Sequence, residues 1–396
     1  MLNDFLKYQA QTSPYPLGME VSHAIGSYIY DTNNKKYLDF VAGVSACTLG
    51  HQHPRVKEAI INQLDKYMHV MVYGEYAQDP AVKLCKLLAE NMSEKLNKTY
   101  LVNSGTEAIE GALKLARRIT GRSQLISCHN AYHGNTMGSM SVMGFEERKQ
   151  IFRPLIPDVD FITFNNEADI QKITTKTAGI ILETIQGGAG FIRPHNDFLK
   201  KVRQRCDQVG AIMILDEIQP GFGRTGRLFG FQNYDVVPDV VVMGKGMGGG
   251  MPVGAFTANE AHMDLLSHDP KLGHITTFGG HPVIAAACLA TLQELVETNI
   301  MQEALEKEKL FRQLLVHPLI KEIRGEGLML AIMTESPEIT NQIIFKCQDK
   351  GLILFWLLFE GCAIRITPPL TVSNQEITEG CGIIIEAFNE LTIDNA

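Results

Sequence analysis

An aspartate and a lysine at the ends of two consecutive apolar runs carry the clearest chemical signal in the chain. Asp216 follows the run 211–215, and Lys245 lies two residues beyond the run 240–243. Their separation, 245 − 216 = 29 residues, is that of one strand–helix–strand unit, so both side chains can face one crevice at a sheet edge. A lysine amine can form a Schiff base with pyridoxal phosphate (PLP), and an acid can keep its pyridine nitrogen protonated. The pair therefore predicts a PLP enzyme.

Three other polar or glycine-rich segments also follow short apolar runs, namely 103–107, 131–136 and 183–190. Each has a plain structural interpretation when taken alone: Ser104 and Glu107 fit a helix capping box. Ligands of open α/β sheets bind beyond the carboxyl ends of the strands. The first segment would also place backbone N–H groups and the positive end of a helix dipole where a phosphate can bind. The convergence of several strand ends is the stronger indication of a site.

Two competing motifs are weaker. Glycines at 244, 246 and 249 match a dinucleotide-binding fingerprint, and Asp264 lies 20 residues beyond the first of them. That fingerprint requires a helix to open beneath the pyrophosphate, whereas residues 248–254 are broken by glycine and proline. His51 and His53 suggest a metal site, but with no acid or thiol recognised nearby we expect them to be structural and expect no metal.

Composition narrows the class of protein. The chain has 396 residues, a net charge of −8 and ordinary fractions of hydrophobic (45%) and charged (20%) residues, which is typical of a globular enzyme of two or three domains. The acidic balance argues against nucleic acid or an anionic membrane as partner. The eight cysteines form no Cys-x-x-Cys pair, and we recognise neither a secretory signal nor an apolar run of ~20 residues. These features favour a cytoplasmic location.

The elements that must hold these residues follow from hydrophobic periodicity. Continuously apolar strands are predicted in the large middle part of the chain, and helices between them; this indicates an α/β fold with a mostly parallel sheet. A hairpin is predicted at 28–37, and the apolar stretch 352–359 reads as a buried strand or an active-site edge. The predicted strands are 99–102, 123–128, 178–182, 211–215 and 240–243, and the predicted helices are 107–119, 196–208, 292–315 and 375–391.

The change in texture near residue 290 predicts a smaller α+β domain. We expect an N-terminal segment, 1–50, that packs with this domain, then a large cofactor-binding domain, 51–285, and the small C-terminal domain, 286–396.

Taken together, the motifs resemble those of the class III aminotransferases of PLP fold type I, the family of ornithine, acetylornithine and 4-aminobutyrate aminotransferases. The resemblance covers nearly the whole chain. It rests most on Asp-Glu-Ile-Gln-Pro-Gly-Phe-Gly-Arg-Thr-Gly from 216 and Gly-Lys-Gly-Met-Gly-Gly-Gly-Met-Pro from 244. Further matches are Leu-Gly-His-Gln-His-Pro from 49, Asn-Ser-Gly-Thr-Glu from 103, Thr-Thr-Phe-Gly-Gly from 276 and Arg-Ile-Thr-Pro-Pro from 365.

The resemblance implies a role for each candidate residue. Lys245 would bond covalently to PLP and shuttle protons, while Asp216 would hold the pyridine nitrogen and Gln219 the phenolic oxygen. The other cofactor-binding residues would be Ser104, Gly105 and Thr106 around the phosphate, Tyr132 stacked on the ring, His133 and Glu183. Thr277 would reach the phosphate of a neighbouring subunit, which implies a homodimer with shared active sites. Arg365 would bind a substrate carboxylate, with Asn135 also at the substrate.

Two departures from the family pattern bear on substrate choice, and a third has no evident effect. Asn135 stands where many members have an arginine that helps to hold a second carboxylate, and Gly188 stands where ornithine-like members have a glutamate that masks the arginine matching Arg365. Since glycine cannot mask it, Arg365 should stay available, and selection between α- and ω-substrates must work differently here. Thr184 replaces a usual proline without an evident consequence in the sequence.

The expected activity is a ping-pong transamination from an amino donor to a 2-oxo acid such as 2-oxoglutarate or pyruvate. A donor with an ω-amine is expected, such as ornithine, N-acetylornithine or 4-aminobutyrate. The same fold also hosts aminomutases, decarboxylases and racemases, which the sequence separates poorly. A non-catalytic relative is the third possibility, but such relatives usually lose the lysine or the acid, and both are present.

Overall fold

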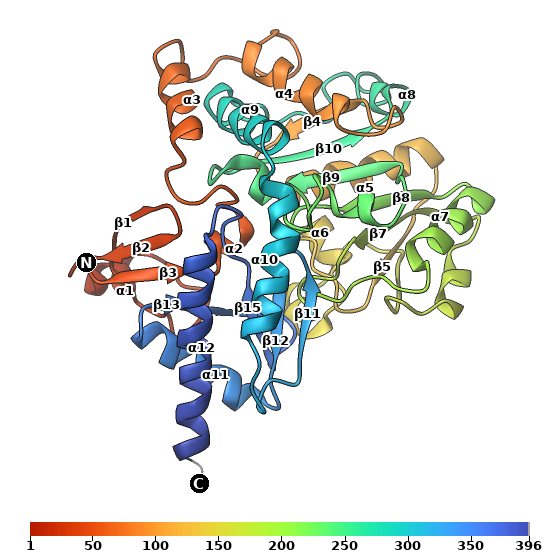
Figure 1. Ribbon diagram of the computed structural model, residues 1–396. Coiled ribbons are helices and arrows are strands. Elements are labelled where there is room, and N and C mark those ends of the chain that lie inside the picture. The colour runs from red at the N-terminus through yellow and green to blue at the C-terminus, as the bar shows by residue number, and fades with distance from the viewer. Residues whose placement is uncertain (395–396) are drawn as a thin grey trace.

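The computed structural model describes residues 1–394, and a seven-stranded sheet forms its centre (Figure 1). The strand order is β4-β10-β9-β8-β7-β5-β6. All strands run parallel except β10, which is antiparallel to both of its neighbours. The α/β class with a mostly parallel sheet is thus confirmed. The strands are β4 Lys98–Val102, β5 Gln124–Cys128, β6 Val159–Ile162, β7 Thr177–Glu183, β8 Ile212–Asp216, β9 Val240–Gly244 and β10 Gly254–Ala258.

The central strands are apolar along their whole length because both faces of the sheet are covered. Alternate residues of β8 and β9 pack into different clusters: Leu215 and Val241 into one, Ile214 and Val242 into the other. Helix α5 (Gly105–Thr120) packs across β10, β9 and β7, and α7 (Phe198–Val209) packs on β8. The continuous apolar runs in the sequence predicted strands that are buried on both faces of the sheet.

Two smaller four-stranded sheets lie beside the central one. The first has the order β1-β2-β3-β13 and the second β11-β12-β15-β14. Because β13 pairs in parallel with β3, residues 352–353 hydrogen-bond beside the N-terminal segment, where Figure 1 draws red and blue ribbons together. The strands are β1 Val21–Ile25, β2 Tyr28–Asp31, β3 Lys36–Asp39, β11 Glu322–Glu326, β12 Met329–Met333, β13 Leu352–Ile353, β14 Phe355–Trp356 and β15 Ala363–Ile366.

The predicted hairpin is present as β2 and β3. The domain boundaries at 50/51 and 285/286 stay a prediction. The remaining helices are α1 Leu2–Tyr8, α2 Ala42–Ser45, α3 Pro54–Leu64, α4 Asp79–Glu90, α6 Met137–Ser141, α8 Glu260–Asp264, α9 Pro282–Glu297, α10 Ile300–Leu314, α11 Pro337–Asp349 and α12 Asn374–Asp394. Short 3₁₀ turns occur at 146–148, 150–152, 168–172, 230–233 and 245–248.

The single helix predicted at 292–315 is wrong. Two helices, α9 and α10, meet there at 71°, and Thr298 between them is extended (ψ 171°). The two helices have different surroundings, since α9 packs against α3 and α4, whereas α10 packs against α12 and β11. The axis turns because each apolar face is buried in a different place. Within residues 1–394 no single helix is long and apolar enough to cross a membrane. Among these residues only α9 and α10, counted together, have the length and apolar composition of a span, and they are bent at 71°.

Candidate active site

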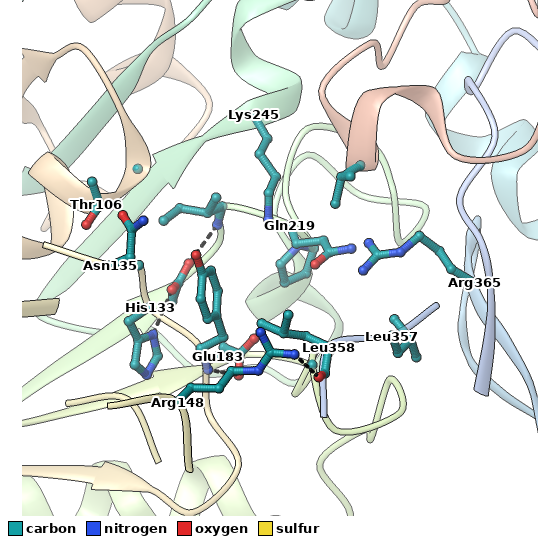
Figure 2. A pocket seen from close by; sticks show the side chains of 18 of the residues that line it. Thr106, His133, Asn135, Arg148, Glu183, Gln219, Lys245, Leu357, Leu358 and Arg365 are labelled. Atoms are coloured by element: carbon teal, nitrogen blue, oxygen red, sulfur yellow. Dashed lines mark hydrogen bonds and ion pairs between the residues drawn. The ribbon is translucent and has the colours of Figure 1, made fainter. Parts of the chain in front are cut away.

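A cavity of about 560 Å³ opens at the carboxyl ends of the parallel strands (Figure 2). Its walls come from the ends of β8 and β9, the start of α5, the loops after β5 and β7, and the segment around β14 and β15. The lining residues are Val44, Gly105, Thr106, Tyr132, His133, Gly134, Asn135, Arg148, Glu183, Gly188, Asp216, Ile218, Gln219, Pro220, Lys245, Phe355, Trp356, Leu357, Leu358 and Arg365. Segments far apart in the sequence thus meet in one site.

Lys245 points into this cavity from the first residue after β9 (Figure 2). Its backbone is left-handed (φ 43°), a conformation that costs energy in a residue with a side chain and is found preferentially at functional sites. Burial and, to a smaller extent, the positive charge of Arg365 lower the pKa of the ammonium group to about 8, against opposing effects of Asp216 and Glu183. The four-residue 3₁₀ turn that starts here is too short to be the α-helix that a dinucleotide fingerprint requires.

Asp216, the last residue of β8, is buried and held at both carboxylate oxygens. Oδ2 lies 2.8 Å from Nδ1 of His133, and Oδ1 accepts a hydrogen bond from the backbone N–H of Ile218 at 3.0 Å. His133 is itself buried in the loop after β5. The carboxylate is therefore oriented before any ligand binds, which is how a charge is fixed in place for chemistry.

Glu183, at the end of β7, forms a second buried acid beside this pair. Its carboxylate accepts hydrogen bonds from the N–H groups of Gly187 (3.0 Å) and Tyr132 (3.3 Å). Burial raises the pKa of Glu183 to about 7; nearby Asp216 raises it too, while His133 lowers it. Burial likewise raises the pKa of the Tyr132 phenol. Glu183 thus fixes the loop that carries Tyr132.

The start of α5 provides an anion-binding end of the cavity. Ser104 is the N-cap, and its hydroxyl accepts from the N–H of Glu107 at 3.3 Å. Glu107 reaches back to the N–H of Asn103 (2.8 Å), one residue earlier than in an ordinary capping box. The next two residues, Gly105 and Thr106, line the cavity at the positive end of this 16-residue helix. A Cβ at position 105 would lie 2.7 Å from Cδ1 of Ile218, so a larger residue would require the Ile218 side chain to shift.

Hydroxyl groups surround Thr106. Its Oγ1 lies 2.8 Å from that of Thr136 and 2.7 Å from the Ser139 hydroxyl. Glu110 accepts hydrogen bonds from Thr136 and from the N–H groups of Gly138 and Ser139. This network joins α5 to the start of α6 and so shapes the end of the cavity at Thr106.

Arg365 enters the cavity from β15 on another side, where Figure 2 shows its guanidinium pointing inward. It is only 6% exposed, yet its Nε and Nη1 have no hydrogen-bond partner among the described residues. Burial lowers its pKa to about 10. A buried cation with unsatisfied donors is a site for an anion, since leaving such groups unpaired is costly.

Gly188 lies under Phe359, and a Cβ there would approach Cδ2 of Phe359 to 2.8 Å. No side chain at 188 can therefore cover Arg365 in this arrangement. Thr184, which lines no part of the cavity, acquires a consequence that the sequence did not show: its hydroxyl donates to Oε1 of Glu217 at 2.5 Å. Glu217 also accepts from the N–H groups of Gly230 and Phe231, and so anchors the loop behind Asp216.

Ten of the twelve residues expected at the site line the cavity. They are Gly105, Thr106, Tyr132, His133, Asn135, Glu183, Asp216, Gln219, Lys245 and Arg365. Ser104 caps α5 instead of lining the cavity, and Thr277 is exposed and does not line this chain's cavity. Gln219 donates to the hydroxyl of Ser45 at 3.4 Å, which ties it to the N-terminal segment.

The expectation that no acid or thiol lies near His51 is corrected by the structure. Nε2 of His51 is 2.8 Å from Oδ2 of Asp39, and this contact, helped by Cys47, raises the pKa of His51 to about 9. The two groups are twelve residues apart in the chain, and an antiparallel bridge between Gly26 and His51 holds the loop beside the sheet that contains Asp39. Among residues 1–394 no cluster of three or more histidines, cysteines or acids could hold a metal.

Sequence reasoning missed several lining residues. Val44 (φ 61°), Ile218 and Pro220 shape the walls, and Arg148 contributes a second cation. Arg148 lies in the polar run Glu-Glu-Arg-Lys, which resembles an ordinary solvated surface. By contrast, the apolar stretch 352–359 was expected at the active-site edge, and its residues 355–358 do line the cavity.

The cavity has the parts that PLP requires: a lysine amine, a fixed buried carboxylate and a helix N-terminus at its anion-binding end. Comparison with solved structures agrees. The chain superimposes on an ornithine aminotransferase from Toxoplasma gondii with a TM-score of 0.92 and 28% identity, over 100% of this chain and 95% of that one. That structure has PLP at partial occupancy in its active site. The fold is therefore that of the PLP fold type I enzymes.

The sequence comparisons are more specific. The family model for class III aminotransferases matches residues 8–388. An acetylornithine aminotransferase from Clostridium acetobutylicum is 38% identical over 376 residues, 92% of this chain and 94% of that protein. A LysW-aminoadipate semialdehyde/glutamate semialdehyde transaminase from Sulfolobus acidocaldarius is 33% identical over 383 residues, 96% of each chain. The chain belongs to the class III aminotransferases, as the motifs predicted, and it is a PLP-dependent aminotransferase.

Proposed function

We propose that this enzyme transfers the amino group of an ω-amino donor that carries a carboxylate to a 2-oxo acid. The observation that carries the proposal is that Lys245, Asp216 and the unpaired Arg365 face one cavity. The relatives named for acetylornithine and for semialdehyde transamination support a donor of this kind. The competing aminomutase, decarboxylase and racemase activities are not favoured by any of these relatives.

The cavity residues would share the work as follows. When bound, PLP supplies the electron sink that stabilises negative charge on the substrate carbon bearing the amine. Asp216, positioned by His133, would hold the proton on the pyridine nitrogen, while Gly105 and Thr106 would bind the phosphate at the start of α5. Tyr132 would stack on the ring and Gln219 would reach its phenolic oxygen. Glu183 would fix the Tyr132 loop.

Lys245 would be the general base and acid. With a pKa of about 8, about a tenth of its amine is neutral at pH 7, far more than for an ordinary lysine. General base catalysis is most effective when the pKa lies close to the working pH. Arg365 would hold a substrate carboxylate through its free donors and so place the reacting amine near Lys245. Each step needs a group that the cavity already holds in position.

The residue at position 188 bears on the range of substrates. Phe359 fills the space over Gly188, so no carboxylate competes with the substrate for Arg365 from that position. We propose that donors are selected by the carboxylate that they present to Arg365, and that ornithine has no special advantage over its N-acyl derivatives or 4-aminobutyrate.

We propose a cytoplasmic homodimer as the working form. Exposed apolar side chains gather on two segments, with Met68, Met71 and Tyr76 on one and Ile275 and Phe278 on the other. The segments are adjacent, because His69 lies 4.9 Å from Phe278, ring centre to ring centre. Thr277, exposed on the second segment, would then reach the phosphate of the partner's cofactor. The eight cysteines are all free, as a reducing compartment would keep them.

A panel of amino donors against 2-oxoglutarate and pyruvate tests the proposal. We expect kcat/KM to be highest for ω-amino donors that carry a carboxylate, with one 2-oxo acid converted to its amino acid for each donor consumed. Arg365→Gln should lower kcat/KM for such donors about 10- to 100-fold, because charge-assisted hydrogen bonds are lost, and should affect a plain alkylamine less. Product without stoichiometric loss of the 2-oxo acid, or equal losses for both kinds of donor, would contradict the proposal.

A further inference from the structure

Arg148, which no part of the proposed chemistry uses, supplies the cavity with a second positive charge. It ends the 3₁₀ turn Glu146–Arg148 and lines the cavity (Figure 2). Its Nη2 donates to the carbonyl oxygen of Leu358 at 3.1 Å, and its guanidinium carbon lies 5.7 Å from the ring centre of Phe359. Among residues 1–394 it has no carboxylate partner, whereas its neighbours Lys149 and Arg153 both lie within ion-pair distance of Glu146.

The guanidinium is held in place by the aromatic side chains beneath it. Phe359 stacks on Phe145 with ring centres 4.5 Å apart and also lies 6.3 Å from Tyr132. Its backbone N–H donates to the carbonyl of Gly188 at 2.9 Å, and its ring covers that glycine. A guanidinium that rests on an aromatic face and donates one hydrogen bond keeps its other donors free in a fixed plane. Burial raises the pKa of Tyr132, and the positive charge of Arg148 opposes this rise, so Arg148 lies close enough to act on a side chain that lines the cavity.

The charges of the cavity remain unbalanced without a ligand. Its two acids are already engaged: Asp216 with His133 and the N–H of Ile218, and Glu183 with the N–H groups of Tyr132 and Gly187. Arg365 and Arg148, which enter from different walls, have no acidic partner among the described residues. Asn135, which lies beside Thr106 in Figure 2, carries no charge. Arg148 is exposed and therefore partly screened by water, whereas Arg365 is buried. Two guanidinium groups that line one cavity together favour a bound molecule with two negative charges.

We propose that Arg148 binds a second carboxylate of the substrate, so that the site selects dicarboxylic 2-oxo acids and amino acids over monocarboxylic ones. This inference rests on the proposed function, in which Arg365 holds the first carboxylate. A planar guanidinium suits this task because it can make two parallel hydrogen bonds to a carboxylate. A dicarboxylate then spans the cavity between the two arginines, whereas pyruvate can satisfy only one of them.

Binding of unreactive acids to the PLP-loaded enzyme tests the inference apart from turnover. Isothermal titration should show glutarate binding about 10- to 100-fold more tightly than butyrate, the difference expected for one added charge-assisted contact. Arg148→Gln should remove most of that preference, and Arg148→Lys should restore part of it. Arg153→Gln is the matched control, since it removes the same charge from the same segment at a residue that does not line the cavity.

Kinetics give a second readout. The ratio of kcat/KM for 2-oxoglutarate to that for pyruvate should fall about 10- to 100-fold in Arg148→Gln and stay unchanged in Arg153→Gln. If the wild-type enzyme transfers amino groups but the glutarate preference and this ratio survive in Arg148→Gln, the inference is overturned while the proposed function stands. If no donor and acceptor pair reacts at all, the proposed function fails, and the glutarate titration alone decides whether Arg148 binds a carboxylate.

Discussion

At the scale of single residues, the site depends on the balance of charge around Lys245. Burial and Arg365 lower the pKa of its amine, while Asp216 and Glu183 raise it. Asp216 is in turn held by His133 and the backbone. The carboxylate and the amine could be inferred from the sequence, because each stands where an apolar run ends. Their partners could not, since the contact between His133 and Asp216 joins residues 83 positions apart.

The lowered pKa of Lys245 predicts how PLP attachment depends on pH. Only the neutral amine can attack the cofactor's aldehyde, so the rate at which apo-enzyme forms its covalent bond to PLP should rise with pH through about 8 and then level off. Trapping the product with borohydride at timed intervals and measuring its mass gives this rate. Arg365→Gln should move the midpoint to higher pH, because it removes a charge that lowers the pKa, while Arg153→Gln should not move it. A midpoint close to 10.5, the ordinary value for lysine, would contradict this explanation.

At the scale of elements, the ends of strands β7, β8 and β9 carry the acids and the lysine of the site, and loops supply much of the remaining lining of the cavity. The strands β4, β5, β7, β8 and β9 and helix α5 were predictable because their hydrophobic patterns are regular, whereas the four-residue strand β6, which contains Asp160, was missed. The antiparallel β10 was missed because it follows the glycine-rich segment after Lys245, and α9 and α10 were merged because periodicity does not show a bend. Arg148 was missed for a different reason: nothing in a charged surface run shows that one of its exposed members also lines the cavity.

The contact between β3 and the loop at 51 should stabilise the fold in a pH-dependent way. Asp39 raises the pKa of folded His51 from 6.5 to about 9, so the stabilisation is fully present below pH 6.5 and is lost as the pH rises through 9. His51→Gln should lower the free energy of unfolding by about 1–2 kcal/mol at pH 6, allowing for solvent screening. The loss should shrink toward zero at pH 10.

Urea titrations at the two pH values measure this difference. The exposed His23 on β1 provides the control, since His23→Gln removes an imidazole from the same sheet without touching Asp39. If the loss of unfolding free energy in His51→Gln grew with pH, the contact between His51 and Asp39 would not be its cause.

At the scale of the whole molecule, the proposed homodimer explains why Thr277 lies outside its own cavity. The resemblance to class III aminotransferases suggested this arrangement, and hydrophobic periodicity has no bearing on it. The exposed apolar segments around residues 68–76 and 272–278 lie where a partner could cover them. Neither the shape of the interface nor the partner's contacts follow from one chain, because both depend on surfaces that only assembly brings together.

Subunit mixing tests whether active sites are shared. Lys245→Ala and Thr277→Asp should each be inactive alone, the second because its carboxylate repels the partner's phosphate. Random exchange of the two variants should restore about a quarter of wild-type activity, because half of the dimers are hybrids and one site in each hybrid is intact. Light scattering gives the assembly state. No recovery after proven exchange would show that Thr277 does not serve a neighbouring site.

The central claim is that Lys245 holds PLP and Asp216 holds the opposite end of its ring. The most direct measurement is borohydride reduction of the PLP-loaded enzyme, followed by proteolysis and mass spectrometry of the peptides. We predict that the pyridoxyl phosphate group is found on Lys245 alone, and that Lys245→Ala carries no label. Label on another lysine, or none on a protein that binds PLP, would contradict the assignment of this site.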